Sequence, residues 1–358
     1  MQSNDAYPFN TITTPSFTVM LAQTDNAGHA LMTCQPSSTC TAFSQEEHFP
    51  STMATHINQM WQQRHEGRFT GVKQCELGWV SLTPGHSDKV IVVVNGRVET
   101  YWKYQELFYD LIQQGYHIYS LDHRGQGVSD RLVEDKEMGY VEQFDDYVED
   151  LNWFVENIVK PQGYKQHFIL GHSMGGAITS LLLARYPQLF DRAVLSAPMH
   201  GIYVKPHLKP LAEALIGITE CFSSTPRYAI GQKPYYAKPF DGNLLTHSKV
   251  RYQWFRELYD QKPALRIGGA SNHWVWESIK AARQAIKLAS NITIPVLLLQ
   301  GSEDKIVDNA SQVRFSQAAN QGQGQCNFQI IQGSRHEILF ESDPLRHQAL
   351  TAILHHFA

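Results

Sequence analysis

A serine at residue 173 lies in a pattern that can support nucleophilic catalysis. Residues 171–175 read Gly-His-Ser-Met-Gly, which has the form G-x-S-x-G; the apolar run HFIL precedes them, and a segment with apolar residues at helical spacing follows. In such a strand–turn–helix context a sharp turn lifts the serine hydroxyl to the amino end of a helix, where developing negative charge is stabilised. On the pattern alone, a serine that only caps the helix is the alternative.

A serine hydroxyl becomes a good nucleophile only when a base takes its proton and an acid orients that base. The acid candidate is Asp304, which follows the apolar run PVLLLQ, and the base candidate is His336, which follows the run NFQII. Each comes just after a predicted strand, and the chain order Ser, Asp, His is that of α/β-hydrolases. We therefore interpret Ser173, Asp304 and His336 as a catalytic triad, with Glu303 and Asp308 as the alternative acids.

The anion that forms when Ser173 attacks an acyl carbon needs two backbone N–H donors. One is expected from the residue after the nucleophile, Met174, and the other from the loop after the run VIVVV, where the N–H of Arg97 is our choice. His172 is adjacent to the serine in the chain, so its side chain points elsewhere and we interpret it as structural. The segment 122–129 lacks the GxGxxG spacing and the lysine of a phosphate-binding loop, and is interpreted as a structural turn.

The elements that must position these residues alternate between short apolar runs and segments of helical periodicity. The alternation begins at about residue 76, breaks after Pro198 and resumes at residue 294. It predicts an α/β-hydrolase fold, in which a mostly parallel, doubly wound sheet is covered by helices on both sides. The aromatic-rich interval that interrupts the alternation is predicted to be an inserted, mainly helical cap over the carboxyl ends of the strands.

Four segments are predicted from this pattern. The first residues are rich in Ser, Thr, Asn and Pro and show no sustained period, which is typical of a loosely ordered extension. The predicted boundaries are 1–43 for this N-terminal extension, 44–198 for the first part of the core, 199–290 for the cap and 291–358 for the second part of the core.

Composition and charge exclude several classes of function. The 358 residues carry a formal net charge of -4 without a basic block, so nucleic acid is not expected as a partner. No HExxH pattern occurs among the 17 histidines and no CxxC pair among the 5 cysteines, and neither a metal nor another cofactor is predicted. The apolar runs are far shorter than the roughly 18 residues of a membrane-spanning helix. The scattered cysteines favour a reducing compartment inside the cell.

Longer stretches around these motifs, including NGRVETYWKYQEL, DHRGQGVSDR, GHSMGGAITSL and HWVWESI, resemble the monoglyceride-lipase-like α/β-hydrolases, and within them the bacterial PldB-type lysophospholipases. The resemblance runs from about residue 45 to 357. It implies hydrolysis of the single acyl ester of a lysophospholipid to a fatty acid and a glycerophosphodiester, without a cofactor. It also implies a cytoplasmic protein that associates peripherally with the inner membrane. The family's triad and oxyanion positions match Ser173, Asp304, His336, Arg97 and Met174.

Substrate-binding residues are predicted from side-chain type. The aromatic cap offers apolar surface to an acyl chain, at about 0.8 kcal/mol per buried CH₂ group, and Trp254 and Trp274 are the candidates. The guanidinium of Arg97 is the candidate for the lipid phosphate, with a salt bridge to Glu99 or another acid as the alternative. A monoacylglycerol lipase, a broad carboxylesterase and a non-catalytic ligand-binding protein of the same fold are the competing functions.

Overall fold

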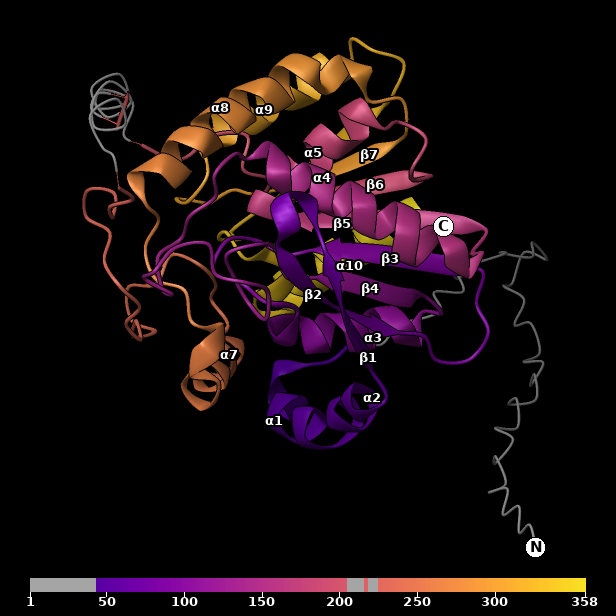
Figure 1. The fold of residues 1–358 in the computed structure, drawn as a ribbon. Helices are drawn as coiled ribbons and strands as arrows, with labels where there is room; N and C mark the ends of the chain where they lie inside the picture. The colour runs from indigo at the N-terminus through magenta and orange to yellow at the C-terminus, as the bar shows by residue number, and fades with distance from the viewer. Residues whose placement is uncertain (1–42, 205–215, 218–224) are drawn as a thin grey trace, which may run out of the picture. The chain divides into compact units, whose positions relative to one another are not determined.

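The structure is a computed structural model that describes residues 43–204, 216–217 and 225–358. Its described part is built around a sheet of eight strands in the order β1-β2-β4-β3-β5-β6-β7-β8 (Figure 1). Strands β3 to β8 pair in parallel, whereas β1 and β2 are antiparallel and lie at one edge. The strands are β1 (His65–Thr70), β2 (Glu76–Leu82), β3 (Lys89–Val94), β4 (His117–Leu121), β5 (Gln166–His172), β6 (Arg192–Ser196), β7 (Val296–Gly301) and β8 (Cys326–Ile331).

Helices cover both faces of this sheet, as the α/β-hydrolase fold requires. The apolar side chains of α4, α5, α8 and α9 pack on one face, and those of α3 and α10 pack on the other. The main helices are α1 (Phe49–Thr52), α2 (Asn58–Gln62), α3 (Gln105–Gln113), α4 (Asp145–Phe154), α5 (Met174–Arg185), α7 (Lys249–Gln261), α8 (Asn272–Leu288), α9 (Asn309–Ala319) and α10 (Asp343–Phe357). The predicted fold class is therefore confirmed.

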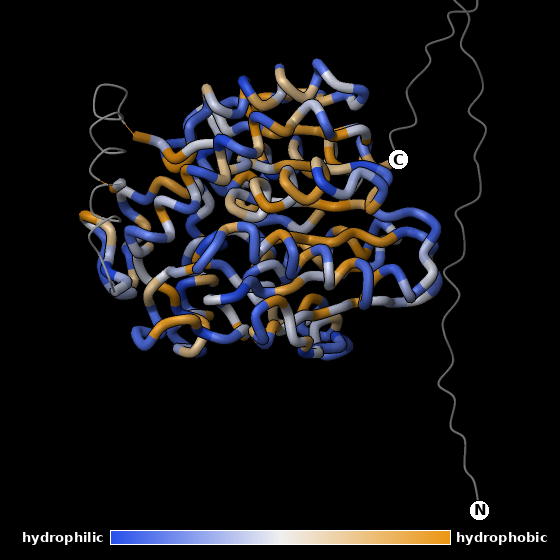
Figure 2. The backbone as a smooth tube through the Cα atoms, turned by 45° about the horizontal axis from the view of Figure 1, so that its top comes forward, coloured by the Kyte–Doolittle hydropathy of each residue, from blue (hydrophilic) through white to orange (hydrophobic). Residues whose placement is uncertain are grey.

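The sequence of β3 shows why the central strands read as unbroken apolar runs. Val90, Val92 and Val94 belong to the cluster under α4 and α5, whereas Ile91 and Val93 belong to the cluster under α3 and α10. A strand that is buried on both faces has no polar side to show in its periodicity. Figure 2 shows the result, with hydrophobic segments gathered along the inner strands and hydrophilic ones in the outer loops.

The segment before the first predicted strand contains structure that periodicity did not reveal. Short helical turns run from Glu46 to Gln62, and β1 follows them at the edge of the sheet. The predicted N-terminal extension, residues 1–43, lies outside the described residues except for Phe43. That side chain is buried and its ring centroid lies 5.4 Å from that of His347, so Phe43 belongs to the folded body.

Among its described residues, the predicted cap, residues 199–290, contains two long helices with different surroundings. Figure 1 shows α8 beside α9, and α8 also packs against α5, so it completes the helix layer on one face of the sheet. In contrast, α7 packs against α1 and against the loops near the sheet's carboxyl edge. The boundaries of the cap remain a prediction, and the packing of α8 favours a cap that ends before Asn272. None of the helices described is long and apolar enough to cross a membrane.

A cluster of buried ion pairs attaches α7 to the core. The guanidinium of Arg251 lies 2.9 Å from Glu106 of α3 and 2.8 Å from Asp343 of α10. Beside it, the fully buried Arg346 pairs with Asp110 at 2.7 Å. Arginine suits such sites because its planar fork satisfies two acceptors at once. The cluster therefore holds α3, α7 and α10 in a fixed arrangement.

A second buried pair fixes the turn that follows β4. Arg124 donates to Asp150 of α4 at 2.6 and 2.7 Å, and both side chains are almost fully buried. We predict that Asp150→Ala lowers the free energy of unfolding by about 3 kcal/mol, because the buried guanidinium loses its nearer, doubly bonded counter-ion and retains only Asp146, at 3.4 Å. Denaturant unfolding measures this change.

The matched control for this prediction is Asp88→Ala. Asp88 pairs with Lys165 at the surface, where solvent screens the attraction, so this variant should unfold almost like the parent protein. Equal effects of the two substitutions would contradict the assignment of the Arg124 pair as a structural tie.

Candidate active site

The three residues of the predicted triad lie in hydrogen-bonding contact. Nε2 of His336 is 2.9 Å from Oγ of Ser173, and Nδ1 of the same ring is 2.7 Å from Oδ2 of Asp304. They come from the loops after β5, β7 and β8, which end at the same edge of the parallel sheet. All three side chains are buried. The arrangement matches the geometry in which a histidine takes a proton from serine while a carboxylate orients the ring.

Ser173 occupies the sharp turn between β5 and α5. Its backbone has φ 53° and ψ −117°, a left-handed conformation that costs energy for any residue with a side chain. A side chain at Gly175 would strike the carbonyl oxygens of Val94 and Asn95, so only glycine allows α5 to approach β3 this closely. The turn is held by two backbone bonds, from the N–H of Ser173 to Ser196 at 3.0 Å and from the N–H of Met199 to Ser173 at 2.9 Å.

The alternative acids, Asp308 and Glu303, make other contacts. Asp308 caps α9, since its carboxylate accepts from the N–H of Ala310 at 3.1 Å and from the hydroxyl of Ser311 at 2.7 Å. Glu303 lies 3.8 Å from Nε2 of His247. Asp304, in contrast, also accepts at its second oxygen from the N–H of Ile306, at 2.7 Å. The geometry therefore favours Asp304 as the residue that orients the base.

Burial and charge act in opposite directions on this pair. Burial alone would lower the pKa of His336, but the neighbouring Asp304 carboxylate raises it above its ordinary value. Burial likewise raises the pKa of Asp304, and the histidine together with two backbone N–H groups lowers it overall. The carboxylate is therefore ionised at neutral pH, and the protonated form of the histidine is stabilised.

His172 is poorly suited to the role of base. Its Nδ1 lies 3.2 Å from the carbonyl oxygen of Ser196, and burial lowers its pKa to about 4, which makes the ring a weak base. Its contacts agree with the structural role interpreted from the sequence.

The loop after β3 adjoins the nucleophile at Gly96. A side chain built there would approach the Cβ of Ser173 to 3.2 Å. The N–H of Gly96 donates to Oε2 of Glu99 at 2.6 Å and is thus engaged, and the N–H of the next residue, Arg97, stays the predicted donor of this loop. Met174 is the first residue of α5, and the N–H groups of a helix's first turn have no partner within the helix. The structure therefore brings both predicted oxyanion residues to the elbow.

The segment 122–129 acts as a brace for this loop. Nε2 of Gln126 donates to the carbonyl oxygens of Gly96 at 2.8 Å and Glu99 at 2.9 Å. The buried carboxylate of Asp122 accepts from the side chain of Asn95 at 3.0 Å. These contacts agree with a structural turn and show what it supports.

The predicted substrate-binding residues differ in their surroundings. Arg97 donates to the carbonyl oxygen of Gly268 at 3.1 Å and lies over the ring of Trp274, with 5.2 Å between the guanidinium carbon and the centroid. Trp254 packs edge-on against Phe49 of α1, with ring centroids 6.1 Å apart. That packing does not support a role for Trp254 in substrate binding, whereas Trp274 lies beside the oxyanion loop through Arg97.

In the part of the chain that the structure describes, no ion pair joins Arg97 to a carboxylate. The alternative partner, Glu99, pairs with Lys103 at 2.8 Å. Burial without a counter-ion lowers the pKa of Arg97 to about 10. The guanidinium remains charged at neutral pH and can accept an anionic partner.

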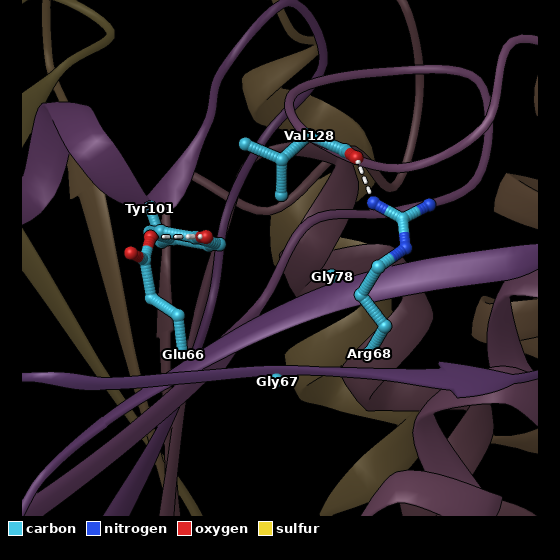
Figure 3. Close-up of a pocket in the computed structure, with 6 residues that line it drawn as sticks. All are labelled: Glu66, Gly67, Arg68, Gly78, Tyr101 and Val128. Carbon is cyan, nitrogen blue, oxygen red and sulfur yellow. Dashed lines mark hydrogen bonds between the residues drawn. The ribbon is translucent and has the colours of Figure 1, made fainter.

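Two hollows of the surface lie away from the triad. One of about 250 Å³ forms over β1 and β2, where Tyr101 donates to Glu66 at 2.8 Å and Arg68 donates to the carbonyl oxygen of Val128 at 2.8 Å (Figure 3). The other, of about 840 Å³, lies between β8 and α10. No triad residue lines either hollow. Among the described residues, no group of three metal-binding side chains comes together.

The contacts between the charged residues behind the oxyanion loop were not predicted from the sequence. Glu99, Lys103 and Glu337 are all buried and in contact, although charged residues usually indicate a surface. The only signals in the sequence are the i,i+4 spacing of the first two and the position of the third directly after His336.

These features define a serine hydrolase: a sharp turn that carries Ser173, a histidine and carboxylate in contact with it, and a loop with backbone donors beside it. The chain belongs to the family described as Serine aminopeptidase, S33, whose model matches residues 85–343. Together with relatives named as lysophospholipases, the family match confirms the resemblance noted in the sequence, and the protein is an ester hydrolase.

Its relatives include lipid hydrolases. The chain is 40% identical to Lysophospholipase L2 of Escherichia coli K12 over 322 residues, which cover 88% of this chain and 93% of that protein. It is 29% identical to Monoglyceride lipase of Mus musculus over 63% of this chain and 68% of that protein. Among solved structures, a soluble variant of monoglyceride lipase from Saccharomyces cerevisiae has a TM-score of 0.63 at 17% identity, with 82% of this chain and 95% of that chain covered. That structural likeness shows the shared fold.

We predict that Asp304→Asn lowers kcat on a soluble ester by about 10³–10⁴-fold, because the histidine then loses the carboxylate that orients and stabilises it. Asp308→Asn is the control, since asparagine caps a helix about as well as aspartate and should leave kcat within a few-fold of the parent. Steady-state kinetics with thermal unfolding of each variant measures both effects. The reverse ranking would show that the acid is Asp308.

Proposed function

We propose that this protein hydrolyses the acyl ester of lysophospholipids, releasing a fatty acid and a glycerophosphodiester. The observation that carries the proposal is the guanidinium of Arg97 next to the oxyanion loop, which pairs with no carboxylate among the described residues, in a chain 40% identical to a protein named Lysophospholipase L2. A phosphodiester supplies an anion for this partly buried cation, and arginine binds phosphate through two parallel hydrogen bonds.

The reaction proceeds in two halves. His336 takes the proton of Ser173 as its oxygen attacks the ester carbonyl carbon, and the N–H groups of Arg97 and Met174 stabilise the resulting oxyanion. The ester bond then breaks: the glycerol oxygen leaves with the proton from His336, and the acyl group stays on the serine. A water molecule next gives a proton to His336 as its oxygen attacks the acyl carbon of the acyl-enzyme. The bond to Ser173 then breaks, the serine oxygen takes that proton back from His336, and the fatty acid is released. Asp304 stabilises the imidazolium in both halves.

The monoacylglycerol lipase activity is the second candidate, because proteins of that name are among the relatives and the structural neighbours. A monoacylglycerol has the same acyl ester but no phosphate. Arg97 thus separates the two candidates, since its side chain has an anionic partner only in the lysophospholipid.

We predict that Arg97→Gln lowers kcat/KM for a lysophospholipid by about 10–100-fold, the loss that corresponds to one charged hydrogen bond, and changes kcat/KM for the matching monoacylglycerol by less than about 3-fold. The backbone N–H that serves the oxyanion is retained in this variant. Side-by-side assays of both lipids with products identified by mass measure the effect. A parent enzyme that prefers the neutral lipid, or a variant that loses both activities equally, would contradict the substrate assignment.

We further propose that the protein works as a peripheral protein on the cytoplasmic side of a membrane, where such lipids reside. The loop at residues 225–244 supports this proposal, because Ile230, Tyr236 and Leu244 are exposed there beside Lys233, whose ammonium lies 3.8 Å from the ring centroid of Tyr236. Exposed apolar side chains with neighbouring lysines suit the interface of an anionic bilayer.

We predict that the double variant Ile230→Ser/Tyr236→Ser binds anionic phosphatidylglycerol vesicles at least about 5-fold more weakly, because it removes apolar contact area from the loop. Vesicle sedimentation measures binding, and turnover of a soluble ester should be unchanged. Val313→Ser, an exposed position on α9, is the control. Equal binding of the parent protein and the double variant would exclude this loop as the contact surface.

A further inference from the structure

Three charged side chains form a buried cluster behind the active site. The ammonium of Lys103 lies 2.8 Å from Oε1 of Glu99 and 2.7 Å from Oε1 of Glu337. All three side chains are at most 6% exposed. The rings of Phe255 and Phe340 lie 4.5 and 4.4 Å from the ammonium, so aromatic faces cover the cation where carboxylates do not.

The cluster joins the two loops that serve the reaction. Oε2 of Glu99 accepts from the N–H of Gly96 at 2.6 Å and from the hydroxyl of Tyr104 at 2.6 Å. At the other end, Glu337 is covalently next to the base, His336. A continuous series of contacts therefore runs from the oxyanion loop through Lys103 to the loop that carries the base.

Stability does not account for this cluster. Removing an ion from water costs several kcal/mol even after relaxation, and apolar replacements of buried ion pairs are often as stable or more so. Two carboxylates share one ammonium, which leaves one negative charge in excess. Moreover, Oε2 of Glu337 is buried and has no hydrogen-bond partner among the described residues, so the carboxylate is held through Oε1 and Lys103.

The negative charges around His336 favour the protonated form of its imidazole. Asp304 contributes most, and Glu337 and Glu99 also raise the pKa of the imidazole against the effect of burial. His172, with its ring centroid 5.1 Å from that of His336, is neutral at neutral pH because burial lowers its pKa to about 4. Lys103 is the positive group of the set, and it is outnumbered by the carboxylates.

The inserted segment closes the cluster from water. Phe255 belongs to α7, and from the same helix the hydroxyl of Tyr259 donates to the carbonyl oxygen of Val98 in the oxyanion loop, at 2.8 Å. The N–H of Glu337 donates to the carbonyl oxygen of Leu245 at 2.8 Å. Because the surroundings are dry, a charge acts on the imidazole more strongly than it would in solvent.

We propose that Glu99, Lys103 and Glu337 are positioning residues: they hold the oxyanion loop and the base loop in register, and their excess negative charge stabilises the imidazolium that His336 forms when Ser173 gives up its proton. This inference rests on the catalytic roles given above for the triad, and it is independent of which ester is the substrate.

The decisive variant is Glu337→Gln, which keeps the shape of the side chain and one acceptor for Lys103 but removes the excess charge. Free enzyme must hold His336 neutral to act as base, so the acid limb of the kcat/KM profile follows the pKa of that imidazole. Loss of the negative charge lowers this pKa. We expect the limb to move down by about one pH unit and kcat to fall about tenfold, the equivalent of that shift.

Two further variants separate charge from structure. Glu337→Asp keeps the charge and should leave the acid limb in place, even if kcat falls. Glu99→Gln turns an amide N–H₂ toward the ammonium of Lys103 and thereby breaks the link; it should lower kcat at every pH, with KM little changed. Combined with Glu337→Gln, it should lower kcat by less than the product of the single effects, because both variants interrupt the same series of contacts.

The control is Asp110→Asn, which removes a buried carboxylate of α3 from its pair with Arg346. It should lower the melting temperature, because Arg346 loses its nearest counter-ion, and it should leave the pH profile unchanged. An unshifted limb with full kcat in Glu337→Gln, or an equal shift in the control, would overturn the proposal.

A soluble p-nitrophenyl ester is the substrate for all of these profiles. It reports turnover by the serine whatever lipid the enzyme prefers. A parent protein that cleaves this ester but no lysophospholipid would contradict the proposed function, and the pH profiles could still be measured. The inference about Glu99, Lys103 and Glu337 depends only on the pH profiles of the variants.

Discussion

The left-handed backbone of Ser173 is the constraint on which the rest of the structure depends. A residue with a side chain holds this conformation only where its surroundings fix it from several sides. The bonds to Ser196 and Met199 fix the turn, and Gly175 lets α5 lie against β3. The strained turn in turn requires β5 to lie beside β3, because the oxyanion loop must meet the hydroxyl from the neighbouring strand. The strand order of the sheet satisfies this requirement.

Around that turn, one set of contacts connects the acid and the base to the serine, and another set holds the oxyanion loop. Parallel strands deliver the acid and the base to one edge, where hydrogen bonds of 2.7 and 2.9 Å connect them to the serine. A second set of contacts, through Gln126 and Glu99, keeps the oxyanion loop rigid. Preorganised donors stabilise a developing charge without having to reorient during the reaction, which is the largest contribution in many enzymes of this kind.

The central strands and the contact of Ser173 with His336 and Asp304 could be predicted from the sequence, because both follow from local rules. Central strands are apolar on both faces, and Asp304 and His336 come directly after two of them. The buried Glu99 and Lys103 could not be predicted in this way, since only the folded chain shows that Glu337, more than two hundred residues later, completes their cluster. Trp254 shows the opposite case: its type suited an acyl chain, yet the tertiary packing turns it toward Phe49.

The ion pairs of Arg251 bear on how a substrate reaches the serine. Moving α7 outward as a rigid body would break its bonds to Glu106 and Asp343 and leave the buried guanidinium of Arg251 without these two partners. Such a movement is much more costly than a rearrangement of the loop that precedes the helix. We therefore expect α7 to keep its place during turnover, and any rearrangement that admits a substrate to come from the shorter segments around it.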